Sequence, residues 1–75
     1  MKLIHELKIE REYLIRLISG TKKQEIRFND RDYQRGDILR FSDGKKKEFE
    51  FLITHIHSGL GLMDGYVALS LEIVK

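Results

Sequence analysis

Three charged side chains at short spacing, Lys22, Glu25 and Arg27, are the residues of this sequence best suited to chemistry. Lysine and arginine can donate hydrogen bonds to a phosphate or a base carbonyl, and glutamate can accept one from an exocyclic amine. Such a set can read a nucleoside. The alternative is structural, because Glu25 and Arg27 could pair with each other or with the turn at residues 30–32. The spacing alone leaves both interpretations open.

Polar and aromatic side chains extend this candidate site. Asn29, Asp30 and Arg31 follow the set directly, and short polar side chains there favour a turn or a single helical turn because they bond to their own backbone. Two tyrosines could stack on a base. The predicted ligand-binding residues are Lys22, Glu25, Arg27, Asn29, Asp30, Arg31, Tyr33 and Tyr66.

Local patterns predict a strand and then a helix before the charged set. Residues 3–9 alternate as in a strand, with His5 on the mainly apolar face, where we expect it to bond to backbone. Residues 10–19 carry apolar side chains at helical spacing, and Gly20 can end that helix in the left-handed conformation. The apolar helix face is predicted to comprise Tyr13, Leu14, Leu17 and Ile18.

The charged set itself lies on a predicted strand that starts near residue 22. Alternation places Gln24, Ile26 and Phe28 on one side of this strand and Glu25 and Arg27 on the other. We expect the side with the isoleucine and the phenylalanine to be buried. Glu25 and Arg27 then point the same way, toward a cleft beside the helix.

The second half of the sequence predicts three further strands. Residues 37–42 and 46–57 form a hairpin through the Asp43-Gly44 turn, and apolar side chains on both faces of the longer strand predict a bulge. The apolar loop 58–65 is expected to fold over an opening of a barrel, and residues 66–74 form the closing strand. The predicted inward residues are Leu39, Phe41, Phe49, Phe51, Ile53, Val67, Leu69, Leu71 and Ile73.

Length and composition bound the class of protein. The 75 residues make one domain, and the absence of cysteine excludes disulfides, thiolate metal sites and a cysteine nucleophile. No apolar run is long enough for a signal peptide or a membrane span, so we expect a soluble, cytoplasmic protein. A net charge of +2 predicts that any contact with nucleic acid is local. The oligomeric state is left open.

Two further clusters are given the plainer of two interpretations. The run Lys45 to Lys47 is taken as a solubilising charge cluster at a hairpin end rather than a phosphate-binding patch. His55-x-His57 places two imidazoles on one strand face, but zinc sites use three or four protein ligands and no third ligand is evident. No metal and no cofactor is therefore predicted.

The spacing Gly20-x-Lys22-x-x-Glu25-x-Arg27 resembles the G-x-K-x-x-E-x-R signature of the ASCH domain, a branch of the PUA-like superfamily of small β-barrels. Residues 29–37 and Asp64-Gly65-Tyr66 are similar to a compact bacterial and phage ASCH-related family of uncharacterised function. The resemblance covers nearly the whole chain. It implies an α+β fold, a small PUA-like β-barrel of about five strands with one capping helix.

The resemblance also implies two functions. The first is a binding module for RNA or a nucleotide, as predicted for ASCH domains. The second is an amidohydrolase acting on an N4-acylated cytidine-like nucleoside, in which Lys22 would activate a hydroxyl nucleophile. The threonine that such enzymes carry three residues later is Glu25 here, and Thr21 lies on the wrong side to replace it. Lys22 and Glu25 could still act as an acid and base pair if burial shifts their pKa values.

A third possibility is a protein-interaction domain that uses the apolar loop at residues 60–63. Its only support is the composition of that loop, so it ranks below the other two hypotheses.

Overall fold

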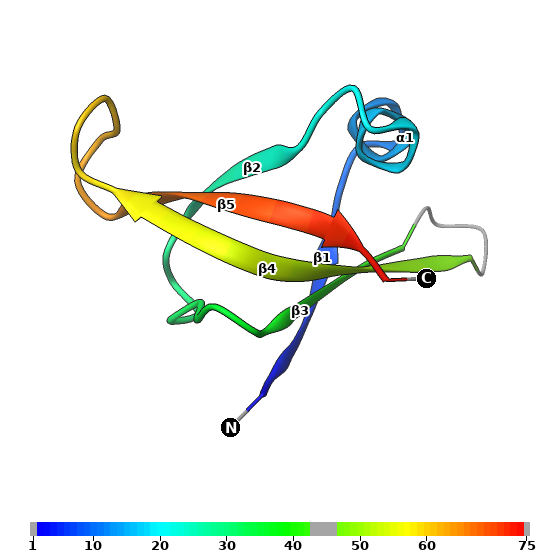
Figure 1. Ribbon diagram of the computed structural model, residues 1–75, viewed down its shortest axis with the longest axis horizontal. Coiled ribbons are helices and arrows are strands. Elements are labelled where there is room, and N and C mark those ends of the chain that lie inside the picture. Colours follow the sequence, from blue (N-terminus) through cyan, green and yellow to red (C-terminus); the bar gives the residue numbers. More distant parts are fainter. Residues whose placement is uncertain (1, 43–46, 75) are drawn as a thin grey trace.

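The helix and five strands expected from the sequence are present in the computed structural model, which describes residues 2–42 and 47–74 (Figure 1). The predicted Asp43-Gly44 turn lies outside the described residues, as do Lys45 and Lys46 of the lysine cluster. In chain order the elements are β1 (Ile4–Lys8), α1 (Arg11–Ser19), β2 (Gln24–Phe28), β3 (Ile38–Ser42), β4 (Glu48–Ser58) and β5 (Tyr66–Ile73).

All five strands belong to one curled sheet in the order β1-β3-β4-β5-β2. β1 pairs with β3 in parallel, and the other neighbours pair antiparallel. The first and last strands of this order, β1 and β2, are consecutive in sequence and are joined through α1. The curl brings these two edges toward each other beside α1, as Figure 1 shows. The sheet is therefore a half-barrel with an open seam between β1 and β2, in agreement with the expected small α+β barrel.

The core lies inside this curl. Leu39 and Phe41 of β3 are fully buried, and from α1 only Leu14 and Leu17 reach the core. Tyr13, which the helical spacing placed on the same face, is 42% exposed. The expected inward residues of β4 and β5 are buried, except that Ile73 is exposed and that Phe49 and Leu71 are only partly buried. The remaining core residues are Leu7, Tyr33, Phe51, Ile53, Val67 and Leu69.

The predicted bulge in the long strand is confirmed. The register between β4 and β5 shifts between Ile53 and His55. Beyond the shift Ile56 packs against the core, whereas His55 and His57 are exposed. One additional residue reverses which side chains point inward, because successive side chains of a strand alternate between its faces.

The predicted buried face of β2 is wrong. Ile26 and Phe28 are 58% and 54% exposed, whereas Glu25 is 7% exposed and faces the inside of the curl. A carboxylate tolerates this position because two cationic side chains bind it there, as described below. On the outer face of the sheet, the Phe28 ring covers Gly65. A Cβ added at Gly65 would lie 2.7 Å from Phe28 Cε1.

The expectation that loop 58–65 covers an opening of the barrel is also wrong. Leu60 is 93% exposed and Met63 75% exposed. The loop extends beyond the ends of β4 and β5, at the left of Figure 1, and its own turn bonds hold it there. These bonds run from the Leu62 N–H to the Gly59 carbonyl (2.8 Å) and from the Tyr66 N–H to the Met63 carbonyl (3.0 Å). Within residues 2–42 and 47–74, no helix is long and apolar enough to cross a membrane.

Candidate functional site

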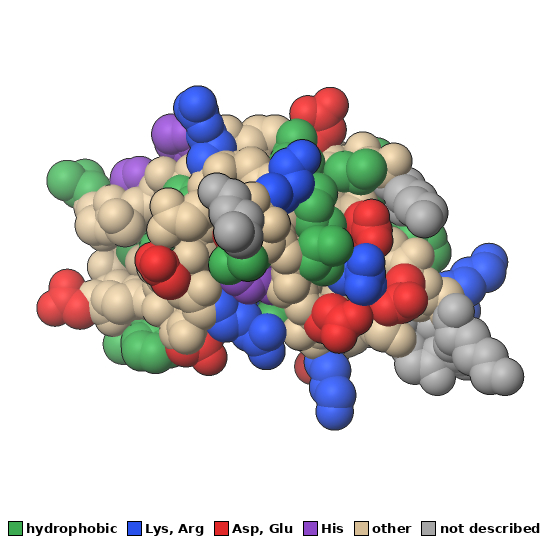
Figure 2. All heavy atoms as spheres, turned by 90° about the horizontal axis from the view of Figure 1, so that it is seen from below, with side chains coloured by type: hydrophobic (Ala, Val, Ile, Leu, Met, Phe, Trp, Pro, Cys, Tyr) green, Lys and Arg blue, Asp and Glu red, His purple; other side chains and the backbone are tan. Residues whose placement is uncertain are grey.

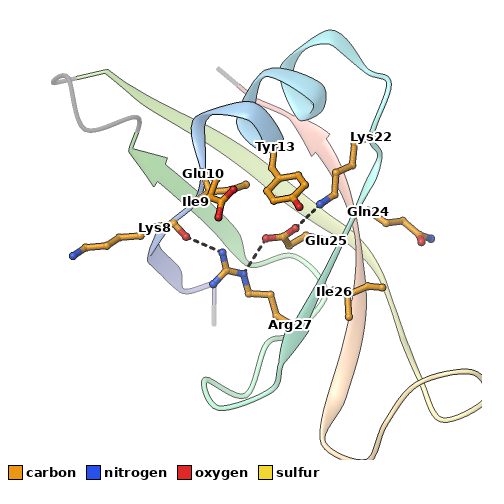
Figure 3. Close-up of a pocket in the computed structure, with 9 residues that line it drawn as sticks. All are labelled: Lys8, Ile9, Glu10, Tyr13, Lys22, Gln24, Glu25, Ile26 and Arg27. Atoms are coloured by element: carbon orange, nitrogen blue, oxygen red, sulfur yellow. Dashed lines mark hydrogen bonds and ion pairs between the residues drawn. The ribbon is translucent and has the colours of Figure 1, made fainter.

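The open seam of the sheet contains a cleft of about 560 Å³ (Figure 3). One wall is the end of β1 and the first turns of α1, with Ile9, Glu10 and Tyr13. The other wall is β2 with the residues that precede it. Lys22, Glu25 and Arg27 all line this cleft, so the fold brings together the three charged residues on which the sequence analysis centred.

Glu25 is held between the two cations. Its Oε1 accepts a hydrogen bond from Lys22 Nζ at 2.9 Å, and its Oε2 accepts one from Arg27 Nε at 3.1 Å. The Glu25 side chain is 10% exposed, and those of Lys22 and Arg27 are 29% and 25% exposed. Glu25 and Arg27 therefore do pair with each other, as the structural interpretation proposed, yet the pair also lies on the surface of a cleft.

Arg27 also ties the two walls of the seam together. Its Nη2 donates a hydrogen bond to the Lys8 carbonyl oxygen at 2.9 Å, across from β2 to β1. Its guanidinium carbon lies 5.8 Å from the centroid of the buried Phe41 ring. The arginine is thus fixed by an ion pair, a backbone acceptor and an aromatic neighbour, so its remaining N–H groups have defined directions.

The end of α1 places Lys22 over Tyr13. Gly20 ends the helix with φ of 83°, in the left-handed conformation predicted for it, and its N–H bonds to the Leu17 carbonyl. The chain then turns back, because the Lys22 N–H bonds to the Arg16 carbonyl at 3.0 Å. Lys22 Nζ lies 4.7 Å from the centroid of the Tyr13 ring, which adds a cation–π contact.

Charges in the cleft are close to balanced. Lys22 and Arg27 face the carboxylates of Glu25 and Glu10, and Figure 3 shows the Lys8 side chain pointing away from the group. On the molecular face shown in Figure 2, basic and acidic side chains are intermingled. The cleft is therefore a polar site with fixed donors and acceptors rather than a strongly cationic one.

Three predicted site residues lie at the far end of β2, outside this cleft. The Asn29 carbonyl oxygen Oδ1 accepts a hydrogen bond from the Tyr33 N–H at 2.9 Å, which stabilises the bend after β2. Asp30 and Arg31 are exposed on that bend. Their position supports the predicted turn, whereas a direct part in binding at the cleft would need a ligand that extends along β2.

The two tyrosines predicted to stack on a base are also outside the cleft. Tyr33 is 3% exposed, and its ring packs edge-on against His5 with centroids 4.8 Å apart. Burial raises the pKa of its phenol, and the ring has no free face for a base, contrary to expectation. Tyr66 is partly exposed and contacts Phe28 on the outer face of the sheet. Tyr13, which the helical spacing placed on the apolar face of the helix, is the aromatic residue of the cleft.

Comparison with known proteins identifies the family. Residues 4–71 match the family model described as Domain of unknown function (DUF3850). The chain belongs to this family. An uncharacterized 12.9 kDa protein from the GpA 3′ region of Escherichia phage P2 is 44% identical over 39 residues, which are 52% of this chain and 36% of the phage protein. The chain thus matches about a third of the length of that curated relative.

A solved structure shares the fold of this DUF3850 domain. The crystal structure of hypothetical protein PH0355 superposes with a TM-score of 0.69, covering 99% of this chain and 100% of the other, at 21% sequence identity. At that identity the likeness concerns the fold alone. It supports the half-barrel with one helix as an arrangement found in another protein.

The DUF3850 domain also holds a buried polar pair, formed by His5 near the start of β1 and Asp37 just before β3. His5 Nε2 lies 2.8 Å from Asp37 Oδ2, and the two residues are 6% and 1% exposed. Asp37 further accepts hydrogen bonds from the backbone N–H groups of Leu3 and Gln34. Burial alone would raise the pKa of Asp37, but these bonds outweigh it and hold the pKa below its usual value. The partner of His5 is therefore a carboxylate, not the expected backbone group.

Within the described residues, the exposed histidines of β4 have no third metal-ligating side chain nearby. His57 Nε2 lies 3.1 Å from the Leu60 carbonyl oxygen, within hydrogen-bonding distance. In the part of the chain that the structure describes, no group of three or more His, Cys, Asp or Glu side chains is placed to hold a metal ion.

Proposed function

We propose that this DUF3850 domain is an ASCH-like, PUA-like module that binds RNA or a nucleotide in the seam cleft. The observation that carries the proposal is the arrangement of Glu25 between Lys22 and Arg27, beside the exposed ring of Tyr13. The three charged positions are those of the ASCH signature, and the fold gathers them on one accessible surface.

The chemistry of the cleft suits a nucleoside. Lys22 Nζ keeps donors beyond the one directed at Glu25, and each Glu25 oxygen keeps a free lone pair. A base that carries a carbonyl beside an amine can bond to both residues at once. Tyr13 offers a partly exposed aromatic face within 4.7 Å of the lysine, and such rings stack on bases.

The geometry favours binding over hydrolysis. An amidohydrolase of the type considered needs a hydroxyl that Lys22 can activate. The hydroxyl nearest in sequence, that of Thr21, lies 3.3 Å from the Arg16 carbonyl and 3.1 Å from Ser19 Oγ, so it is turned toward the end of the helix. Lys22 Nζ is itself directed at the Glu25 carboxylate, 2.9 Å away.

Ligand-observed NMR with nucleosides, nucleotides and short single-stranded RNA tests the proposal. We expect wild-type protein to bind a member of this panel and Lys22→Ala to lose about tenfold in affinity, because a charged donor is removed. Lys23→Ala is the matched control, since Lys23 is exposed and does not line the cleft.

Two results would contradict the binding module. The first is a panel without any bound member, and the second is equal loss in both lysine variants, which would indicate attraction by net charge alone. N4-acetylcytidine belongs in the same panel. We expect it to remain intact, and its Lys22-dependent conversion to cytidine would replace the module with the hydrolase.

A further inference from the structure

The free edge of β2 presents a backbone N–H donor and a C=O acceptor to the proposed site. β2 is the last strand of the sheet and pairs only with β5. The Leu71 N–H bonds to the Lys23 carbonyl at 3.0 Å, and the Asn29 N–H bonds to the Gly65 carbonyl at 2.8 Å. In an antiparallel pair the bonded residues alternate. Residues 25 and 27 therefore direct their backbone toward β5, whereas residues 24 and 26 direct theirs away from it.

The side away from β5 is the cleft. Ile26 lines it, and the opposite wall is the end of β1 with the Lys8 carbonyl. That carbonyl is already bonded by Arg27, whereas within residues 2–42 and 47–74 the Ile26 N–H and C=O form no hydrogen bond. In Figure 3 the Ile26 side chain points to the other side of the strand from Glu25 and Arg27, so it leaves this backbone edge uncovered.

The cations of the cleft are poorly placed to attract a phosphate. Lys22 and Arg27 both bind Glu25, and Arg27 also binds the Lys8 carbonyl. A phosphate would have to compete with a carboxylate that is nearly buried and already bound. Within the described residues, the backbone groups of this edge that form no hydrogen bond are a neutral N–H and C=O, and a neutral heterocycle can pair with them as a neighbouring strand would.

We infer that the cleft reads the base of its ligand through the backbone N–H and C=O of Ile26, and that the phosphate contributes little. This inference rests on the proposed function and names the part of the ligand that is recognised. The ligand class is a nucleobase whose edge carries a donor beside an acceptor. Lys22 and Glu25 complete the contacts to its carbonyl and amine substituents, and Tyr13 covers a face of the ring.

The first test separates base from phosphate. The probes are the four ribonucleosides, their 5′-monophosphates and inorganic phosphate, titrated into ¹⁵N-labelled wild-type protein. We expect the affinities of the best nucleoside and of its monophosphate to agree within about threefold. The nucleoside affinity should change less than about twofold between about 0.05 and about 0.5 M salt. The Ile26 amide resonance should shift on binding, and its hydrogen exchange should slow.

The second test removes the donor. Ile26→Pro deletes an N–H that points away from the β2–β5 ladder, a position where an edge strand tolerates proline. Ile26→Val keeps the N–H and the branched side chain. We expect the proline variant to bind the best nucleoside about three- to tenfold more weakly, as for one lost hydrogen bond, and the valine variant to bind as wild type.

The outcomes distinguish this inference from the proposed function. If no probe that contains a base binds to wild type, the proposed function fails and the inference fails with it. If a ligand binds only with its phosphate, or leaves the Ile26 amide unperturbed, the inference alone is overturned and the module stands. If Ile26→Pro does not fold, the shift and hydrogen exchange of the wild-type Ile26 amide on binding decide whether the inference holds.

Discussion

Glu25 shows how one side chain can be both structural and functional. Both of its carboxylate oxygens are bound, one by Lys22 at 2.9 Å and the other by Arg27 at 3.1 Å. A carboxylate with a side chain 10% exposed is stable there because its partners satisfy it. The same bonds hold the two cations in fixed directions, which is what a ligand site requires.

Replacement of this carboxylate should lower stability. We expect Glu25→Gln to reduce the free energy of unfolding by about 1–3 kcal/mol, since the amide keeps only one acceptor oxygen, turns an NH2 donor toward one cation and leaves two partly buried cations without their counter-charge. Urea denaturation at neutral pH measures the change. Glu12→Gln is the control, because the pair of Glu12 with Arg16 is exposed and should change stability by less than about 0.5 kcal/mol. Equal effects of the two substitutions would refute this role of Glu25.

The buried pair of His5 and Asp37 predicts how the stability of the folded protein depends on pH in the acid range. The pKa of Asp37 lies below its usual value in the folded protein, so the unfolded chain binds a proton there at a higher pH than the folded chain does. The stabilisation is therefore complete above the pKa of the unfolded carboxyl and is lost as the pH falls through the lower folded pKa.

Denaturation at a series of pH values tests this dependence. We expect Asp37→Asn to be less stable than wild type by about 1–3 kcal/mol at neutral pH and to show a flatter decline in acid. Asp64→Asn, at an exposed position of loop 58–65, should leave the acid dependence as in wild type. A curve for Asp37→Asn parallel to that of wild type would show that another group governs the acid limb.

At the scale of elements, β2 has its faces reversed relative to the hydrophobic pattern. A strand of a half-buried sheet normally turns its apolar residues inward. In β2 the inward positions are taken by charged residues of the cleft, and the apolar ones face outward. Phe28 compensates in part, because its ring lies against Tyr66 and over Gly65 on the neighbouring strand and loop. The outer face of β2 is thus tied to β5 by an aromatic contact over a glycine.

This contact predicts different costs for two glycines of the same loop. Gly65 and Gly61 both have φ of 85°, but only at Gly65 would a Cβ meet the Phe28 ring, at 2.7 Å. We expect Gly61→Ala to lower the free energy of unfolding by about 1 kcal/mol, because alanine is strained in this backbone conformation. Gly65→Ala should lower it by about 0.5–1 kcal/mol more, because its Cβ also meets the ring. Thermal or urea denaturation measures both.

A Phe28→Ala background supplies the control. Without the ring, the two glycine substitutions should cost the same, as a double-mutant cycle would show. If the excess at Gly65 persists without the ring, its origin is not the contact with Phe28.

At the scale of the whole molecule, the site follows from the topology. β1 and β2 are the two edges of the sheet, and α1 connects them. A curled sheet whose edges approach without a backbone ladder keeps a seam, and here Arg27 crosses it to the Lys8 carbonyl. The charged set, the first turns of the helix and an unpaired strand edge therefore meet in one cleft. The likeness to hypothetical protein PH0355 concerns the fold alone, and it shows that the curled sheet with its helix is not confined to one chain.

Much of this architecture could be predicted from local sequence. The alternation of Leu39 with Phe41 and of Phe51 with Ile53 set their strands and inward faces, and the break in alternation located the bulge in β4. Gly20 marked the end of the helix because only a residue without a Cβ takes its conformation readily. The spacing of Lys22, Glu25 and Arg27 indicated a site, and the fold does place them side by side.

Tertiary structure alone decided which face of β2 points inward, and with it the form of the site. Alternation shows only that Glu25 and Ile26 face opposite ways. The choice depends on partners far apart in sequence, since Arg27 binds the Lys8 carbonyl and Phe28 covers Gly65. The parallel pairing of β1 with β3, which leaves β1 and β2 as facing edges, is likewise non-local. A hydrophobic pattern records the average preference of each side chain, whereas a bound carboxylate becomes stable inside only once the folded chain supplies its two cations.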